Sequence, residues 1–324
     1  MKLARVFWLL VVAVLSEPAQ AATNLERVHL HGRDYVRLAD WAKAYNFKLT
    51  WLKREESVQV NSRWSKLIFT VDSRRAELNG IGVWLSFPIA YQGGHACISP
   101  LDLDKVFHAV LFPPKNRDKE RVMTICLDPG HGGRDPGNQD GRNQEKDYTL
   151  MLAQELQRQL KEAGFKVIMT RSSDKFVDLG TRSLVAKNLN ADLFVSLHFN
   201  SARSSASGTE VYCLTPPGAS STNAGGEGAT SVMYPGNRKD ENNMLLAFHV
   251  QKQLTALLPA EDRGVRRARF AVLKYVDMPA ILVEGGFMSD RTEARKIYSA
   301  AYRRQMAKAI FEGIQAYKRT VERE

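Results

Sequence analysis

The spacing of hydrophobic and polar positions changes about a third of the way along the chain. Before residue 113, short apolar or alternating runs such as SVQV, KLIFTV and GVWLSF are separated by the turn-like stretches SRWS, DSRR and NG, after one helix-like stretch, LADWAKAYN. Runs of this length with turn residues between them are typical of β-strands. The polar, proline-started segment PPKNRDKE then interrupts the pattern. We therefore predict a small, mostly-β domain over residues 22–112 and a linker over 113–120.

After the linker, strand-like runs alternate with helix-like runs up to about residue 320. The strand patterns are RVMTICL, KVIMTR, DLFVSLHF, TEVYCL and PAILVEGGF. Between the first two, leucines at 152, 156 and 160 recur every four residues, which predicts a helix with one buried face. This alternation favours an α/β fold, with a mixed, mostly parallel sheet covered by helices. We predict a second domain over 121–320, in which the Gly-, Ser-, Thr- and Asn-rich segment 215–240 is an insertion.

The first residues have the pattern of an export signal. Lys2 and Arg5 precede the apolar run VFWLLVVAVL, and Ala19 and Ala21 follow it at a spacing typical of a cleavage site. Ten apolar residues are too few to span a bilayer, and no later stretch is long enough for a membrane helix. We expect residues 1–21 to be a signal peptide, and the mature chain to act in the periplasm or cell envelope without a membrane span.

Composition adds limits rather than a function. A net charge of +11 would suit anionic wall polymers, phospholipid surfaces or nucleic acid. The basic residues are scattered except for RRARF at 266–270, and there is no recognisable nucleic-acid module, so we expect a solvated basic surface and no nucleic-acid partner. Three widely spaced cysteines form neither a disulfide framework nor a zinc finger, and we interpret Cys126 and Cys213 as buried thiols. His29 and His31 lack a third metal-competent neighbour, so we expect surface histidines.

Four side chains capable of metal binding or acid–base chemistry stand at the ends of predicted elements. His131 follows the first strand in the loop LDPGHGG, His198 ends DLFVSLHF, Glu284 lies in PAILVEGGF, and Glu145 begins the first helix. In open α/β folds, ligands bind beyond the carboxyl ends of the strands, so these side chains should meet at one rim. Two histidines and one carboxylate are a common catalytic zinc set, and a further carboxylate could serve as general base.

Each of the four also has a purely structural explanation. His131 could decorate a turn, His198 could be a satisfied core histidine, and a glutamate such as Glu145 is favoured at a helix N-terminus in any case. Glu284 is harder to explain in this way, because a buried carboxylate without a partner costs several kcal/mol. The conjunction of the four favours a catalytic site more strongly than any one of them.

The stretch from Val122 to Lys318 resembles the zinc-dependent N-acetylmuramoyl-L-alanine amidases of the Amidase_3 family. The matching segments, in the family's order, are LDPGHGGRDPG, EKDYTLMLAQELQRQLKEAGFKVIMTR, NADLFVSLHFNSA, GTEVY, RGVRRARFAVLKYVDMPAILVEGGFMSD and AIFEGIQAY. The resemblance implies that His131, Glu145 and His198 bind Zn²⁺ and that Glu284 is the catalytic carboxylate. It also implies a substrate, peptidoglycan, cut at the amide between the lactyl group of N-acetylmuramic acid and L-alanine.

Two further features bear on this resemblance. The first domain resembles copper amine oxidase N-terminal-like domains through YVRLADWAKAYNF and AELNGIGVWLSFPIAYQGG, which implies no copper. The insertion at 215–240 stands where some relatives carry a regulatory helix, but it is polar and glycine-rich, without a clear amphipathic helix. The need for an activator protein therefore stays open.

Several supporting roles can be assigned as expectations. Asn200 could donate to substrate and Arg182 could face a substrate carboxylate, with structural roles equally open for both. Asp128 should lie behind the metal ligands, holding the His131 loop or ring. The glycines around His131 would let an extended glycan–peptide chain approach an open rim.

Two other functions remain as alternatives. One is a zinc peptidase that acts within the stem peptide, and the other is a non-catalytic wall-binding or regulatory protein. The presence of all four chemical residues argues against the second.

Overall fold

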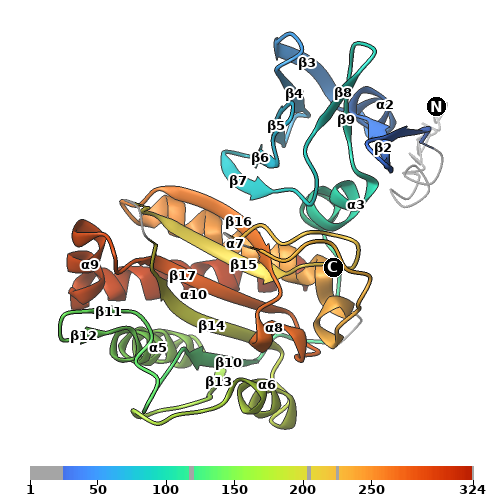
Figure 1. Ribbon diagram of the computed structural model, residues 1–324. Helices are drawn as coiled ribbons and strands as arrows, with labels where there is room; N and C mark the ends of the chain where they lie inside the picture. The colour runs from blue at the N-terminus through green and yellow to red at the C-terminus, as the bar shows by residue number, and fades with distance from the viewer. Residues whose placement is uncertain (1–24, 117–119, 203–205, 224–225, 323–324) are drawn as a thin grey trace, which may run out of the picture.

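The computed structural model describes residues 25–116, 120–202, 206–223 and 226–322 (Figure 1). The predicted signal peptide, residues 1–21, lies outside these described residues. Among them, no helix combines the length and the apolar character needed to cross a membrane.

The first part of the chain is mostly β, as its strand pattern predicted. Its elements are β1 (Arg27–Leu30), β2 (Arg33–Arg37), α2 (Leu38–Ala44), β3 (Lys48–Lys53), β4 (Ser57–Asn61), β5 (Lys66–Thr70), β6 (Arg75–Leu78), β7 (Ile81–Trp84), β8 (Ala90–Gln92), β9 (His95–Ile98), α3 (Pro100–Asp102), the π-helical turn η1 (Leu103–His108) and α4 (Ala109–Leu111). Strands β1, β2, β9 and β8 form one small antiparallel sheet, and β3 to β7 form a meander.

The second part alternates strands and helices. Its elements are β10 (Thr124–Pro129), β11 (Gln139–Asp140), β12 (Asn143–Gln144), α5 (Glu145–Glu162), β13 (Lys166–Met169), α6 (Leu179–Asn188), β14 (Leu193–Asn200), β15 (Thr209–Leu214), the 3₁₀ turn η2 (Pro235–Lys239), α7 (Asp240–Leu257), β16 (Asp262–Ala268), α8 (Ala271–Lys274), β17 (Ala280–Phe287), α9 (Arg291–Tyr298) and α10 (Ala300–Val321). The sequence pattern predicted most of these but missed β16, because its arginine-rich sequence DRGVRRA has no continuous apolar run.

Within the described residues, one eleven-stranded sheet runs through both parts in the order β13-β10-β14-β17-β15-β16-β7-β6-β5-β4-β3. Strands β13, β10, β14 and β17 are parallel, whereas β15 runs antiparallel to β17 and β16 follows the direction of β15. The carboxyl ends of β10, β14 and β17 therefore lie at one edge of the sheet, which we call the rim. The second part is an α/β fold with a mixed, mostly parallel sheet, as predicted.

Helices cover both faces of the strands in the second part (Figure 1). Helices α5, α7 and α10 pack together on one face, and α6 and α8 lie on the other. The alternation along β10 shows the pleat directly: Ile125 and Leu127 join the core beneath α5 and α10, while Cys126 joins the core beneath α6. All three cysteines are free and buried, which confirms the interpretation of Cys126 and Cys213.

The two parts of the chain join where β7 lies beside β16, with Val83 opposite Val265. The Gly82 amide donates to Asp262 Oδ2 at 2.7 Å, and the Trp84 indole donates to the Arg263 carbonyl at 2.9 Å. A Cβ on Gly264 would lie 2.5 Å from the Gly82 carbonyl oxygen, so glycine permits this close approach. The buried apolar residues of the first part are continuous with the core beneath α7 and α10.

The segment after β15 leaves the sheet at the edge opposite the rim, because β15 is antiparallel to β17. Its described residues contain the short η2 turn and no α-helix before α7. Arg269 donates to the carbonyls of Ala219 and Gly228, at 2.6 and 2.9 Å. The expectation that the RRARF cluster is solvated is wrong: its three arginines are at most 9% exposed, because their guanidinium groups find carbonyl and carboxylate partners inside the protein.

Candidate metal centre

The loop after β10 places His131 at the rim. His131 has φ 62°, an uncommon value for a residue with a side chain, and Gly132 follows at φ 125°. A Cβ on Gly130 would lie 2.2 Å from the His198 ring, and one on Gly137 would lie 2.6 Å from the His131 ring. Glycine is needed here because the histidine rings pack directly against bare backbone, a more local reason than the access for substrate that the sequence suggested.

The structure brings His131, Glu145 and His198 together. One potential ligand atom from each lies within 4.8 Å of the others, and no second group of this kind occurs among the described residues. Glu145 is the first residue of α5 and is 1% exposed. Its Oε2 lies 3.1 Å from His131 Nε2, and its Oε1 lies 2.9 Å from His198 Nδ1. Two imidazoles and a carboxylate converge on one point.

The electrostatics of this group follow from its contacts. Although burial opposes it, hydrogen bonds from His131 and His198 hold the pKa of the Glu145 carboxyl well below its usual range. Burial alone would lower the pKa of the His131 imidazole, but Glu145 and Asp135 raise it overall. The Asn138 amide and the Phe199 amide also donate to Glu145, at 2.9 and 3.1 Å. Glu145 is therefore held as an ionised carboxylate between two histidines.

Asp135, which the sequence analysis did not single out, holds the His131 ring. Its Oδ2 lies 2.9 Å from His131 Nδ1, which leaves His131 Nε2 directed at Glu145. A carboxylate that fixes the ring of a metal-binding histidine is a common supporting arrangement. The available signal was an acid four residues after the histidine in HGGRD.

Asp128 acts on the loop rather than on the ring. It accepts hydrogen bonds from Thr170 and Ser196, at 2.6 and 2.8 Å, and from Arg182 at 2.8 Å. Arg182 is 2% exposed and also donates to the His131 carbonyl at 2.7 Å. These contacts account for Arg182 structurally, and they connect Asp128 to the His131 loop through its guanidinium group.

Glu284 lies in β17 directly beside His198 in the sheet register. It is 9% exposed, and its Oε2 is the one carboxylate oxygen among the described residues that is buried without a hydrogen-bond partner. Burial, with Glu145 and Glu210 nearby, raises the pKa of the Glu284 carboxyl well above its usual range. A buried acid without a protein partner is a candidate for proton transfer to or from a bound molecule.

Asn200 and Glu210 continue the rim beyond Glu284. The Asn200 side-chain amide donates to Glu210 Oε1 at 2.8 Å, and Glu210 lies opposite Glu284 in the register of β15 and β17. Arg263 and Arg266 lie 2.9 and 3.1 Å from Glu210 Oε2. Sequence reasoning missed Glu210, although a carboxylate inside the apolar run TEVYCL carries the same signal as Glu284.

The histidines of the first part are not metal-competent in this arrangement. His29 Nδ1 lies 3.2 Å from Asp34 and is well exposed, and His31 occupies a turn at φ 50°. Neither belongs to a group of three potential ligands among the described residues.

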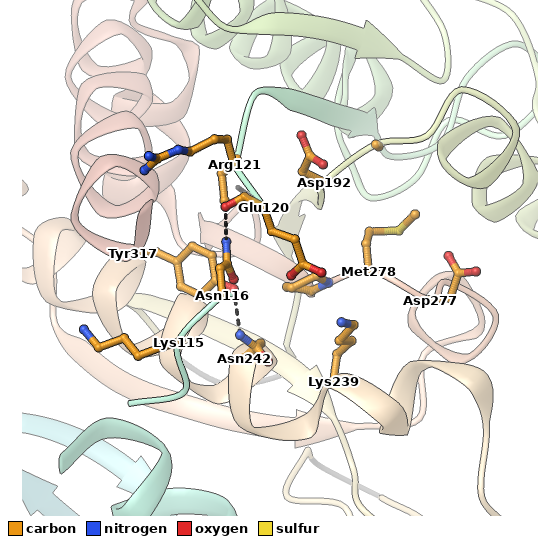
Figure 2. A pocket seen from close by; sticks show the side chains of 13 residues that line it. Lys115, Asn116, Glu120, Arg121, Asp192, Lys239, Asn242, Asp277, Met278 and Tyr317 are labelled. Atoms are coloured by element: carbon orange, nitrogen blue, oxygen red, sulfur yellow. Dashed lines mark hydrogen bonds between the residues drawn. The ribbon is translucent and has the colours of Figure 1, made fainter. Parts of the chain in front are cut away.

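A cavity of about 560 Å³ lies away from the rim, at the edge where β14 and β17 begin (Figure 2). The Asn242 side-chain amide donates to the Tyr317 hydroxyl at 3.0 Å, and Figure 2 shows Asp192, Lys239 and Asp277 around the space. None of the residues predicted for the site lines it.

The chain is similar to known amidases. The family model described as N-acetylmuramoyl-L-alanine amidase matches residues 125–316. The chain is 37% identical to the amidase AmiC of Neisseria meningitidis over 231 residues, covering 64% of this chain and 55% of that protein. It is 32% identical to the amidase AmiA of Escherichia coli, covering 63% of this chain and 79% of that protein.

A solved structure shares the fold of the second part. The crystal structure of an N-acetylmuramoyl-L-alanine amidase from Clostridium difficile 630 matches with a TM-score of 0.52 and 30% identity, covering 61% of this chain and 97% of that one. The chain spans about half the length of the Neisseria relative. Because the family model matches more than half of the chain, and that match contains His131, Glu145, His198 and Glu284, the chain belongs to the N-acetylmuramoyl-L-alanine amidase family, Amidase_3.

Proposed function

We propose that the chain is a zinc-dependent peptidoglycan hydrolase that cuts the amide between the lactyl group of N-acetylmuramic acid and L-alanine of the stem peptide. The observation that carries the proposal is the meeting of His131, Glu145 and His198 at one rim, with Glu284 beside them. Membership of the amidase family supports the choice of bond.

The residues present fit zinc. Two imidazoles and one carboxylate lie close enough to share one ion, and they match a set common in catalytic zinc sites, with a position open for water or substrate. His131, Glu145 and His198 would hold the ion, and Asp135 would fix the ring of the first. When bound, zinc supplies Lewis acidity, which lowers the pKa of a water from 15.7 to roughly 7 and polarises the amide carbonyl.

Glu284 performs the proton transfers in this proposal. Its buried oxygen has no partner within the described protein, so it is available to a bound reactant. It takes a proton from the attacking water and delivers that proton to the departing alanine nitrogen, which is otherwise a poor leaving group. Glu145 has the same side chain but a different role, because both of its oxygens are engaged by the two histidines.

The remaining predictions about the chain belong to the same proposal. We propose that residues 121–320 carry catalysis and that residues 22–112 position the enzyme on the wall. The described part of that first region contains no group of three potential metal ligands. Export through the segment 1–21 would place the enzyme where peptidoglycan is found.

The discriminating experiment is a digest of purified sacculi by the purified chain, with products identified by mass. Free stem peptides with an L-alanine amino terminus are the expected products. Cuts inside the peptide would support the zinc peptidase instead, and binding without any products would support the non-catalytic role. Release by the chain alone would also show that no activator is required.

A further inference from the structure

Two arginine–phenylalanine pairs lie on opposite sides of the candidate metal centre. On the β13 side, the Arg134 guanidinium carbon lies 4.3 Å from the centre of the Phe176 ring. On the β15 side, the Arg263 guanidinium carbon lies 4.8 Å from the centre of the Phe287 ring. The strand order β13-β10-β14-β17-β15-β16 places the metal residues and Glu284 between them.

The first pair is fixed relative to His131. Arg134 lies at the corner of a tight turn in which the Gly132 amide donates to the Asp135 carbonyl at 2.9 Å and the Asp135 amide donates back at 3.2 Å. Asp135, the next residue, holds the His131 ring. The position of Arg134 is therefore coupled to that of a candidate metal ligand.

The loop that carries Phe176 is tied to the same turn. The Gly133 amide donates to Asp174 at 2.7 Å, and Lys146 bridges the Gly133 carbonyl and Asp174 at 2.9 and 2.8 Å. A Cβ on Gly133 would lie 2.6 Å from the Phe176 amide nitrogen, so the two segments are in close contact. Phe176 is 43% exposed, which leaves the stacked pair open to solvent beside the rim.

The two arginines differ in their polar partners. Arg263 already has a carboxylate partner, because its Nε donates to Glu210 at 2.9 Å. Arg134 makes no hydrogen bond or ion pair with any described residue, so its N–H groups are free while its flat face rests on Phe176. A guanidinium group held in this way is suited to bidentate binding of a carboxylate.

The two halves of the proposed substrate differ in charge near the bond that is cut. The lactyl carboxyl of the sugar is consumed in the amide bond, so the glycan side carries no charge near the bond. The peptide beyond L-alanine carries free carboxylates. We propose that Arg134, stacked on Phe176, binds a stem-peptide carboxylate, so that the peptide lies on the β13 side of the metal centre and the glycan on the β15 side. This inference rests on the proposed amidase function and adds a specificity residue to it.

The test compares two soluble N-acetylmuramoyl dipeptides that differ only in whether the carboxyl group of the second amino acid is free or amidated. Arg134→Ala should raise KM for the free acid about three- to tenfold, the range for an exposed but charge-assisted contact, with kcat nearly unchanged. The amidated substrate should show the same KM with both enzymes. Arg134→Lys should recover part of the effect, and added salt should shrink it.

Arg63→Ala is the matched control. Arg63 also stacks on an exposed aromatic ring, 4.4 Å from the centre of Trp64, but in the turn between β4 and β5. It should leave KM for both substrates unchanged. Equal effects of Arg134→Ala on the two substrates, or no effect on either, would overturn the inference while the amidase function stands. If the unaltered enzyme turned over neither substrate and released no stem peptides from sacculi, the proposed function would fail first.

Discussion

The two edges of the sheet in the second part both bury charged side chains, but they pair them differently. At the edge opposite the rim, Arg267 is 2% exposed, and its two terminal nitrogens donate to the carbonyls of Leu214 and Lys105 at 3.0 and 2.6 Å. At the rim, Glu284 is nearly as buried, yet it makes no hydrogen bond within the described protein. Arg267 keeps only its Nε without a partner, whereas Glu284 makes no hydrogen bond at all within the described protein.

Hydrogen-bond partners therefore distinguish a structural residue such as Arg267 from a candidate functional residue such as Glu284 better than burial or residue type does. Burying an ionisable group without any hydrogen-bond partner costs several kcal/mol, so a chain that does so needs a reason outside its own fold. Arg267 donates to the Leu214 carbonyl at the end of β15, and Arg269 donates to the Ala219 carbonyl, so both stabilise the segment that leaves this strand. Glu284 gains its partner only when a reactant binds, and this is the role that we propose for it.

Replacing Glu284 by Gln should produce the largest effect. The variant keeps the size of the side chain but cannot accept and deliver a proton. Turnover of a soluble muramoyl peptide should fall by about two to four powers of ten, which corresponds to ~3–5 kcal/mol in the barrier. Zinc content and substrate affinity, measured by metal analysis and by calorimetry, should stay the same. Near-normal turnover with the metal in place would remove Glu284 from the mechanism.

Replacing Arg267 by Ala should show the opposite pattern. Two buried carbonyl groups lose their donor, so the free energy of unfolding should fall by about 2–4 kcal/mol, measured by urea denaturation. The fraction that remains folded should keep its turnover. Arg54→Ala is the control, because the Arg54 side chain is 87% exposed and its loss should change neither quantity. Lost turnover in folded Arg267→Ala would show that the two edges are not functionally separate.

The residues of the rim were predictable from sequence because each is marked by the pattern of its own strand or helix. His131, His198 and Glu284 each lie at or near the end of an apolar strand pattern, and in a parallel sheet such ends meet. Glu145 begins a helix whose leucine spacing was unambiguous. The structure brings His131 and His198 together as that rule requires, and Glu145 joins them from the start of α5.

What could not be predicted depends on pairing between distant segments. Strand β16 has an arginine-rich sequence without the usual strand pattern. It pairs with β15 on one side and with β7, which is far away in the chain, on the other. Nothing in the local pattern indicates that Val83 lies opposite Val265, or that the sheet continues into the first part of the chain. The burial of the RRARF arginines follows from those partners, so composition alone suggested a solvated surface.

Replacing Glu145 by Gln tests whether its role differs from that of Glu284. A neutral amide is a poorer zinc ligand than a carboxylate, so zinc affinity should fall by about ten- to a hundredfold, or ~1.4–2.7 kcal/mol. Titration with zinc should restore part of the activity of Glu145→Gln and none of that of Glu284→Gln. Rescue of Glu284→Gln by zinc would mean that the two glutamates have exchanged roles.

The smallest effect should come from Arg74, which joins the first part of the chain to the loop after β15. Its Nε donates to the Leu85 carbonyl at 2.9 Å, and a terminal nitrogen donates to the Ser220 carbonyl at 3.0 Å. Because Arg74 is only half-buried, water can replace some of these contacts, and Arg74→Ala should lower the free energy of unfolding by about 1 kcal/mol. Arg74→Lys should lose part of this stability as well, since an ammonium group cannot reproduce the guanidinium fork. Since the sheet and core run through both parts, the urea transition should shift as one step rather than divide into two. If Arg74→Ala left the urea midpoint unchanged but reduced turnover, Arg74 would act in function rather than in stability. Distance from the rim would then no longer separate structural from functional charged residues.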